Sequence, residues 1–447
     1  MKQASGLRLY LGLIVGVALA IRVGAVLYLG DFGPPWDEDW EVIARTLVEK
    51  GYFGLDPNSL YGPNPRLITA FIPPVYPVFL ALMRALAGPW AWLATRLAQA
   101  GLSTLAVALA YRLGWKVFRR ADVSLLGAGL AAVYPPLIGG VAETNAVTLE
   151  VLFVEFFTLL VLTAMEQPVR GMWRWAAAGV VLGVAALTRA TVLVLLPLLV
   201  PCFWLNRPGS FFRAALLPVI TIGVAAAAVI SPWTWRNWIT MHEFIPISSN
   251  GGVNFWIGNN PQATGEFTTP TQLAPELVAG SAHLGEGARD RFFYRQGLTF
   301  IRENPGEFFR LLGAKLVYFL WSRPGIGGAY ANQSSIGLGR AAYQVSNAVM
   351  LPLWLLGMAL SARDDFPSKT RGNSPTHGTS RRLSVFYVAI LGVLLVNLMY
   401  FAGTRYRTPA APYQLLFASY GLTAAGGWVY RRVAHTRNAA SGDADSA

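Results

Sequence analysis

The chain has 447 residues, of which 54% are hydrophobic and 13% are charged, and its formal net charge at pH 7 is +13. Apolar runs of about 20 residues, each able to span about 30 Å of hydrocarbon, recur along it and exclude a soluble globular protein. The basic residues lie mainly in short loops and form no basic stripe with interleaved aromatics, so membrane topology explains the charge better than nucleic-acid binding does. The single cysteine, Cys202, excludes an intrachain disulfide.

The apolar pattern predicts an all-α polytopic membrane protein with ten spans, or up to twelve if two short apolar helices also cross the bilayer. The ten runs are residues 9–29, 93–114, 122–140, 147–166, 172–188, 190–206, 212–231, 341–361, 383–402 and 410–430. Basic residues gather in alternate loops, which places those loops and both termini in the cytoplasm.

The first outer loop, residues 30–92, carries four carboxylates within five positions: Asp37, Glu38, Asp39 and Glu41. Charged residues beside hydrocarbon usually line a site or a water-filled cavity. The alternative is a solvated loop in which Asp37 caps a helix and the other acids stabilise its first turn. Helical spacing after Asp37 predicts an amphipathic surface helix that stops at Gly51, and a second interfacial helix is predicted over residues 75–86.

Residues 232–306 form the largest hydrophilic insertion and are expected to be extracytoplasmic. The density of Gly, Asn and Pro over residues 248–261 predicts tight turns with positive φ rather than a long helix. Residues 305–321 are predicted to form an interfacial helix. The domain prediction is an N-terminal membrane module (1–231), the insertion (232–306), a C-terminal membrane module (307–431) and a disordered cytoplasmic tail (432–447).

Two kinds of charged group are expected on the outer face. The carboxylates are Asp37, Glu38, Asp39 and Glu143, and the cations are Arg189, Arg236, Arg405 and Arg407. A carboxylate can take a proton from an acceptor hydroxyl, and guanidinium groups can clamp a phosphate leaving group. Headgroup anchoring is the alternative role for such arginines. Nearby aromatics such as Trp36, Trp40, Tyr76, Trp233, Trp235 and Trp256 suit either sugar-binding walls or an interfacial belt.

Other common motifs are missing. The sequence contains no phosphate-binding GxxxxGK[ST] or GxGxxG, no HExxH and no GxSxG, and its four histidines lack metal-ligand spacing. Without a cytoplasmic nucleotide-binding domain, an activated donor used outside the cytoplasm is expected to be carried on a lipid.

Several segments resemble the polytopic GT-C glycosyltransferases, in the branch of the protein O-mannosyltransferases and the lipid A aminoarabinose transferase. They are Asp37-Glu38, Pro73-Pro74-Val75-Tyr76-Pro77, Leu187-Thr188-Arg189, the run from Asn250 to Pro261 (NGGVNFWIGNNP) and Arg405-Tyr406-Arg407-Thr408-Pro409. The resemblance implies a GT-C fold and a polyprenyl-phosphate sugar donor. It implies that Asp37 is the catalytic base with Glu38 beside it, and that Arg189 and Arg405 face the lipid phosphate. This chain departs from the family pattern at Glu41, where a tyrosine is frequent, and at Ile72, where a basic residue or histidine often precedes the two prolines.

We therefore expect an inverting glycosyltransferase of the bacterial plasma membrane with an extracytoplasmic active site. The expected catalytic residues are Asp37, Glu38 and Glu143, and the expected substrate contacts are Arg189, Arg236, Asn250, Asn254, Arg405, Tyr406 and Arg407. Asp37 and Glu143 could hold a divalent cation, but the arginines supply the same electrostatic stabilisation, so no obligatory metal is expected.

The expected partners are a polyprenyl-phosphate sugar, membrane lipids and a lipid, protein or polysaccharide acceptor, with no nucleic acid. The alternatives are a flippase or other transporter of lipid-linked sugars, and a ligase or polymerase that moves whole glycans.

Overall fold

The computed structural model describes residues 2–29, 39–55, 68–166, 171–206, 211–321, 333–365 and 377–442. Asp37 and Glu38 lie outside these residues. Within them the chain is helical, and the only extended pairings are two isolated bridges, Gly54 with Ile68 and Glu266 with Ala402. The all-α prediction is confirmed.

The helices follow in chain order. They are α1 (Lys2–Leu29), α2 (Asp39–Lys50), α3 (Val75–Ala87), η1 (Gly88–Trp90), α4 (Ala91–Phe118), α5 (Ala121–Val133), α6 (Pro135–Gly139), α7 (Val147–Glu166), α8 (Met172–Thr188), η2 (Ala190–Val194), α9 (Leu195–Asn206), η3 (Phe212–Leu216), α10 (Leu217–Met241), α11 (Gly251–Gly258), α12 (Pro270–Leu273), α13 (Pro275–Gly280), α14 (Glu286–Glu303), α15 (Pro305–Leu320), α16 (Gln333–Asp365), α17 (His377–Met399), α18 (Thr404–Arg407), η4 (Thr408–Ala410) and α19 (Ala411–Gly442).

The chain is an integral membrane protein. Six helical segments of the described residues are long and apolar enough to cross a bilayer, and three shorter apolar helices accompany them. The predicted run 122–140 is divided, because Tyr134 has extended backbone and precedes Pro135 and Pro136, so α5 ends at Val133 and the short α6 begins after it.

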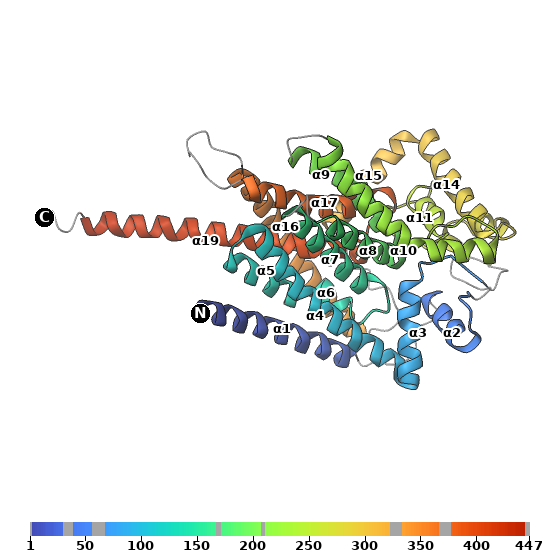
Figure 1. Cartoon of the computed structure of the whole chain (residues 1–447), viewed down its shortest axis with the longest axis horizontal. Coiled ribbons are helices and arrows are strands. Elements are labelled where there is room, and N and C mark those ends of the chain that lie inside the picture. The colour runs from blue at the N-terminus through green and yellow to red at the C-terminus, as the bar shows by residue number, and fades with distance from the viewer. Residues whose placement is uncertain are drawn as a thin grey trace.

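The two ends of the molecule differ in what they carry. Both termini lie at one end of the long axis, whereas α2, α3, α11 and α14 gather at the opposite end (Figure 1). Glu166, the last residue of α7, forms ion pairs with Lys116, Arg119 and Arg382. The predicted first outer loop and insertion therefore lie together, away from the basic loops.

Close helix packing depends on small residues, as is usual where lipid removes the hydrophobic driving force between helices. Gly179 and Gly183 lie one turn apart on α8, facing α10. A Cβ on Gly179 would lie 2.3 Å from the carbonyl oxygen of Ile222, and one on Gly183 would lie 2.7 Å from Cβ of Val229. The glycines thus allow the two helix backbones to approach.

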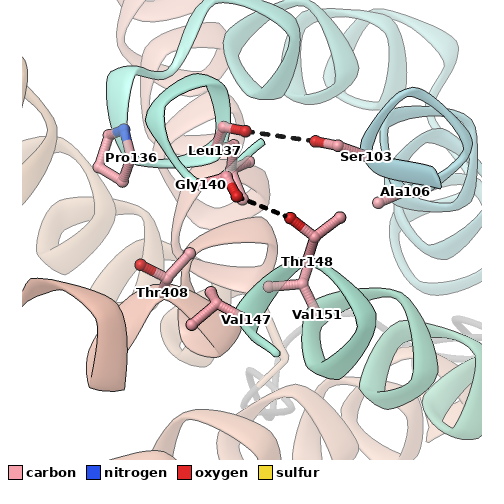
Figure 2. A pocket seen from close by; sticks show the side chains of 9 residues that line it. All are labelled: Ser103, Ala106, Pro136, Leu137, Gly140, Val147, Thr148, Val151 and Thr408. Atoms are coloured by element: carbon pink, nitrogen blue, oxygen red, sulfur yellow. Dashed lines mark hydrogen bonds between the residues drawn. The ribbon is translucent and has the colours of Figure 1, made fainter. Parts of the chain in front are cut away.

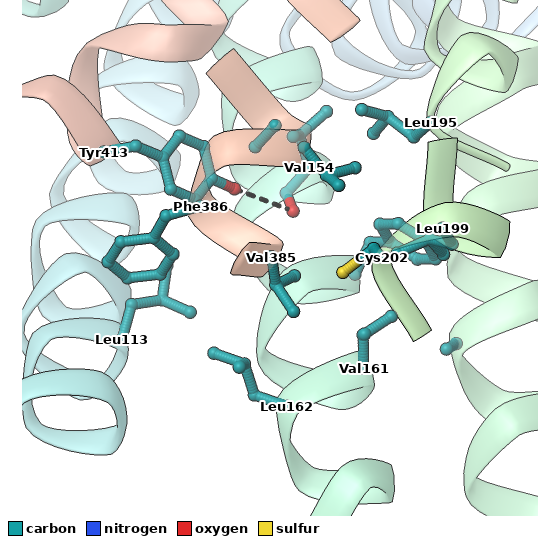
Figure 3. Packing of buried hydrophobic residues seen from close by; sticks show 14 of the residues in the cluster. Leu113, Val154, Val161, Leu162, Leu195, Leu199, Cys202, Val385, Phe386 and Tyr413 are labelled. Carbon is teal, nitrogen blue, oxygen red and sulfur yellow. Dashed lines mark hydrogen bonds between the residues drawn. The ribbon is translucent and has the colours of Figure 1, made fainter. Parts of the chain in front are cut away.

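The main hydrophobic core takes side chains from α4, α7, α8, α9, α10, α17 and α19, and Figure 3 shows part of it. Phe386 of α17 packs edge-on against Tyr413 of α19, with the ring centroids 5.2 Å apart. The Tyr413 hydroxyl donates to the carbonyl of Val154 and also lies 2.8 Å from the Thr158 hydroxyl. These bonds satisfy the one polar atom of a fully buried side chain and fix α19 against α7.

Glu155, on α7, is fully buried, and neither carboxylate oxygen has a hydrogen-bond partner among the residues that the structure describes. A buried polar group without partners costs about 1–3 kcal/mol, and replacement by an apolar residue of similar shape removes that cost. We expect Glu155→Leu to stabilise the folded protein by about that amount, measured as a higher melting temperature in detergent.

The matched control for that variant is Glu150→Leu on the same helix. It removes the partner of Arg189 and should lower the melting temperature instead. A lower melting temperature for Glu155→Leu would show that this carboxyl has a stabilising partner.

A second buried polar group is fully satisfied. Arg22 of α1 is 0% exposed and donates to the carbonyls of Ala131 and Ala132, the last turn of α5, and to the hydroxyl of Ser103 on α4. A cation at a helix C-terminus meets the orphan carbonyls and the negative end of the helix dipole. Arg22 therefore binds α1 to both α4 and α5.

Two expectations are wrong. Residues 251–258 form the helix α11 instead of tight turns, and none of residues 248–261 has positive φ. The reason is that the glycines of this segment allow close packing, as shown below. The tail predicted to be disordered continues α19 as far as Gly442, because residues after Arg431 such as Ala and Arg favour helix.

Candidate functional site

Three predicted site residues meet where α8 ends and α18 lies. Arg189 follows the last residue of α8, and Arg405 and Tyr406 lie on α18. The guanidinium carbons of Arg189 and Arg405 each lie 4.8 Å from the centroid of the Tyr406 ring. Arg405 also donates to the Tyr406 hydroxyl at 2.6 Å. We call these three residues the arginine–tyrosine cluster.

Glu150 joins this cluster from the first turn of α7. Its carboxylate accepts a hydrogen bond from Arg189 at 2.8 Å and is 7% exposed, while the Arg189 side chain is 22% exposed. A buried carboxylate needs such a partner, and the pair fixes the direction of the guanidinium. With two cations and one carboxylate, the cluster and Glu150 together carry a net charge of +1.

The geometry of the cluster suits an anion. Each guanidinium carbon lies over the tyrosine ring, which is a cation–π contact. Guanidinium N–H groups bind phosphate oxygens two at a time. The shared ring also holds two like charges near one another, and an anion that contacts both would relieve their repulsion.

Glu143 lies in the connection before α7, where Asn145 and Gln99 hold it. Asn145 donates to the Glu143 carboxylate at 2.6 Å, and its own side-chain oxygen accepts from the amide of Val147 at the start of α7. Gln99 of α4 donates to the Glu143 carbonyl and accepts from the Tyr76 hydroxyl. The Pro73–Pro77 segment thus positions the loop that carries Glu143.

Arg236 lies on α10 and contacts the predicted first outer loop. Its guanidinium donates to the carbonyls of Thr69 and Phe53 and stacks on Trp233, 4.7 Å from the ring centroid. These contacts join Arg236 to residues 53 and 69 of the predicted first outer loop. Arg236 thus braces this loop, and its predicted substrate contact stays a prediction.

Glu286, at the start of α14, braces the same loop from the insertion. Its carboxylate is 8% exposed and accepts from the Thr69 hydroxyl at 2.6 Å, the Ala70 amide at 2.9 Å and the Ser249 hydroxyl at 2.8 Å. A carboxylate in a helix first turn also meets the positive end of the helix dipole. Glu286 thereby joins α14, the loop after residue 67 and the segment before α11.

Arg407 belongs to the interior and not to the cluster. It is 5% exposed, and it donates to the carbonyls of Phe319 and Leu320 at the end of α15 and to the side chains of Asn347 and Tyr134. The guanidinium caps α15, and its predicted substrate contact stays a prediction. Residues two apart on a helix point in directions about 200° apart, so Arg405 and Arg407 face different surroundings.

Asn250 and Asn254 lie on the motif that forms α11. Asn250 precedes the helix and its side-chain oxygen accepts from the Ser248 hydroxyl, while Asn254 is half-buried within the helix. The hydrogen bonds and ring contacts found among the described residues do not link either asparagine to the arginine–tyrosine cluster.

The glycines of this motif allow close backbone contact. A Cβ on Gly252 would lie 1.9 Å from the carbonyl oxygen of Asp290 on α14, and one on Gly258 would lie 1.6 Å from that of Tyr400. Neither distance is possible for a real Cβ, so only glycine fits. The motif thus docks α11 against α14 and against the segment that leads to Arg405.

Several aromatics expected as sugar walls are core residues. Tyr76 is 1% exposed and packs edge-on against Trp40, and Trp256 is 4% exposed and packs against Phe293. Trp235, by contrast, is 65% exposed on α10. Of these, only Trp235 presents a free surface of any size.

Asp290 carries a pH-dependent interaction in the insertion. Its carboxylate accepts from the Gly252 amide at the start of α11, and burial raises its pKa from 3.8 to about 6. A raised pKa means that the folded state holds the proton more tightly than the unfolded state. The stabilisation is complete below about pH 4 and is lost as the pH rises through about 6.

We expect this loss to be at most about 3 kcal/mol, from 1.36 kcal/mol for each unit of pKa. Asp290→Asn should remove the dependence, which is measured as the free energy of unfolding in detergent between pH 4 and pH 7. Glu303→Gln, an exposed site on the same helix, is the control. The same slope in wild type and Asp290→Asn would assign it to another group.

Metal ligands are not grouped within the described part of the chain, where no three His, Cys, Asp or Glu side chains cluster. Glu143 lies in this part, but Asp37 does not. A small cavity of about 10 Å³ lies among Ser103, Thr148 and Thr408 between α4, α6 and α7 (Figure 2). It has room for about one water molecule, so it cannot hold a sugar ring.

Four residues that shape the site were not among the predicted site residues. They are Glu150, Gln99, Asn145 and Glu286. For Glu150, the available signal was a carboxylate in the first turn of an otherwise apolar helix. Gln99 lies within a long apolar helix, where a polar side chain is a comparable signal.

Comparison with protein families identifies one match. Residues 72–235 match the model of the family described as dolichyl-phosphate-mannose-protein mannosyltransferase. No curated protein sequence matches the chain. The matched residues include the Pro73–Pro77 segment, Glu143 and Arg189.

Solved structures of the oligosaccharyltransferase of Archaeoglobus fulgidus share the fold. The apo form aligns with 95% of this chain and 52% of its own at 13% identity and a TM-score of 0.55. A complex with Zn and sulfate aligns with 96% and 51% at 15% identity and a TM-score of 0.54. AglB from the same organism, in complex with an inhibitory peptide and a dolichol-phosphate, aligns with 94% and 52% at 12% identity and a TM-score of 0.50.

This chain therefore has the GT-C membrane fold and spans about half the length of these relatives. The resemblance found in the sequence is confirmed for the fold.

Proposed function

We propose that this chain is an inverting glycosyltransferase that moves a sugar from a polyprenyl-phosphate donor to an acceptor hydroxyl on the extracytoplasmic face of a bacterial plasma membrane. The arginine–tyrosine cluster carries the proposal. Two guanidinium groups held 4.8 Å from one ring centroid form a clamp of the kind that a phosphate requires. The family matched by residues 72–235 is named for a phosphate-linked sugar donor, and one fold relative was solved with a dolichol-phosphate, which supports the same donor class.

The clamp stabilises the charge that develops as the donor reacts. The acceptor oxygen forms a bond to the anomeric carbon while the bond from that carbon to the phosphate oxygen breaks, and polyprenyl phosphate leaves. Arg189 and Arg405 neutralise the leaving phosphate, whose negative charge grows toward the transition state. The carboxylate of Glu150 keeps Arg189 aimed without neutralising both cations.

The acceptor proton goes to a carboxylate, and we propose Asp37 as that base with Glu38 beside it. Both lie outside the described residues. Arg236 and Glu286 brace the same loop further along the chain, at residues 53, 69 and 70. We propose Glu143, held by Asn145 and Gln99, as the supporting carboxylate.

The test is sugar transfer in reconstituted vesicles from a panel of radiolabelled polyprenyl-phosphate sugars, with and without EDTA. Wild-type protein should consume one donor, and Asp37→Asn should bind that donor yet fail to transfer its sugar. Retained transfer in EDTA is expected, because the arginines neutralise the phosphate.

Full activity of Asp37→Asn would overturn the choice of base. Absence of any donor turnover, with protein-dependent movement of the lipid between leaflets, would overturn the enzyme assignment in favour of a transporter.

A further inference from the structure

Lys315 is a buried cation that the proposed reaction does not use. It lies on α15, which is outside the membrane-crossing segments, and it is 0% exposed. Its Nζ donates to the side-chain oxygen of Asn259 and to the carbonyl of Leu398, both at 3.1 Å. Ion pairs of the described residues do not include Lys315. A buried ammonium without a carboxylate is costly, so its retention needs a reason.

The group that Lys315 binds is the end of α17. The last four carbonyls of a helix have no partner within the helix, and a cation there also meets the negative end of its dipole. Lys315 takes the carbonyl of Leu398, and Asn259 donates to the carbonyl of the next residue, Met399, at 2.9 Å. Lys315 and Asn259 together therefore form a cap for α17.

This cap lies directly before the arginine–tyrosine cluster in the chain. Residues 400–404 connect Met399 to Arg405, and the insertion holds them along their length. The carbonyl of Tyr400 lies against Gly258, and the amide of Ala402 donates to the carbonyl of Gly265. Phe401 packs edge-on against Tyr406, with centroids 4.9 Å apart. A shift of the end of α17 would thus move the clamp.

We propose that Lys315 is a positioning residue for the donor phosphate: with Asn259 it fixes the end of α17 and thereby holds Arg405 and Tyr406 against Arg189. The inference rests on the function proposed above. It also gives the NGGVNFWIGNNP motif a role, because Asn259 and Gly258 belong to that motif and touch the end of α17.

The chemistry of lysine suits this role over a range of pH. Burial lowers the pKa of Lys315 from 10.5 to about 8. A neutral amine still has two N–H groups, which match its two acceptors, so the cap persists in either protonation state.

The test measures binding of a polyprenyl phosphate without sugar to the detergent-solubilised full chain. Lys315→Met keeps the approximate length of the side chain and removes the Nζ group that donates both hydrogen bonds. We expect its dissociation constant to rise about tenfold, equivalent to about 1.4 kcal/mol. Lys315→Gln, which keeps amide donors, should fall between Lys315→Met and wild type. Arg310→Met, an exposed site on the same helix, is the control and should bind as wild type does.

A double-mutant cycle separates positioning from stability. If Lys315 acts through Arg405, Lys315→Met should weaken binding little further when Arg405→Ala is already present. A lowered melting temperature with unchanged binding, or fully additive effects, would overturn the positioning role. Failure of wild type to bind polyprenyl phosphate at all would instead overturn the proposed function.

If Lys315→Met does not fold, the positioning role is tested with Lys315→Gln alone. Unchanged binding by a folded Lys315→Gln protein whose bond to Leu398 is shown to be lost would overturn the proposal, and weaker binding would support it.

Discussion

Arg405→Ala is expected to lower kcat/KM for the polyprenyl-phosphate donor by about 10²- to 10³-fold, the usual effect of removing one preorganised donor to a developing anion. The guanidinium of Arg405 lies 4.8 Å from the Tyr406 ring centroid and donates to the Tyr406 hydroxyl. The variant therefore removes a proposed phosphate ligand and also a contact that holds the Tyr406 ring against Arg189. Arg405→Lys keeps the charge but not the planar fork, and should recover part of the loss. The measurement is initial-rate transfer in reconstituted vesicles.

Arg310→Ala is the matched control for charge. Arg310 is exposed on α15 and pairs only locally with Glu307, so its removal should leave kcat/KM within about twofold, as surface changes usually do. If a folded Arg405→Ala protein keeps activity within threefold of wild type, the clamp is not at this cluster.

Gly258→Ala is expected to destabilise the folded protein by about 3 kcal/mol, at the upper end for overpacking, because the added carbon would lie 1.6 Å from the Tyr400 carbonyl oxygen. Backbone cannot move aside as a side-chain tip can, so α11 must separate from the segment before Arg405. The melting temperature in detergent should fall, and donor binding by the surviving folded protein should weaken because the clamp moves with Tyr400.

Gly313→Ala on α15 is the matched control. Nothing lies within 4 Å of its added Cβ, and alanine is the better helix former, so a gain of about 0.5–1 kcal/mol is expected. Equal melting temperatures for Gly258→Ala and wild type would show that α11 and Tyr400 are not in this close contact.

The membrane helices were predictable because their signal is local. Residues 147–166 are an apolar run, and α7 has those limits since Asn145 bonds the Val147 amide at one end and charge accumulates at the other. The positions of Arg189 and Arg405 at the ends of apolar runs were also predictable from the sequence. Their meeting over Tyr406 joins residues more than 200 positions apart, and only the resemblance to a family suggested it.

The errors share a physical cause. Glycine permits both a positive φ and a close approach of backbones, and the sequence of α11 does not distinguish them. The difference lies in Tyr400, far along the chain. Arg405 and Arg407 likewise look equivalent in sequence, but their positions on one helical turn send the first toward the ring of Tyr406 and the second to the end of α15. Bracing residues such as Glu286 have hydrogen-bond partners in two distant segments, residues 69–70 and Ser249, which no local pattern reveals.

The buried arginine of α1 has a consequence for how the protein is made. An arginine at the centre of an isolated helix in lipid costs about 2.5–3.5 kcal/mol during insertion. The acceptors that satisfy Arg22 belong to Ser103, Ala131 and Ala132, which are synthesised about 80 to 110 residues later. We therefore expect the first helix to be fully stabilised only after α4 and α5 have entered the bilayer, so that α1, α4 and α5 assemble together during biogenesis.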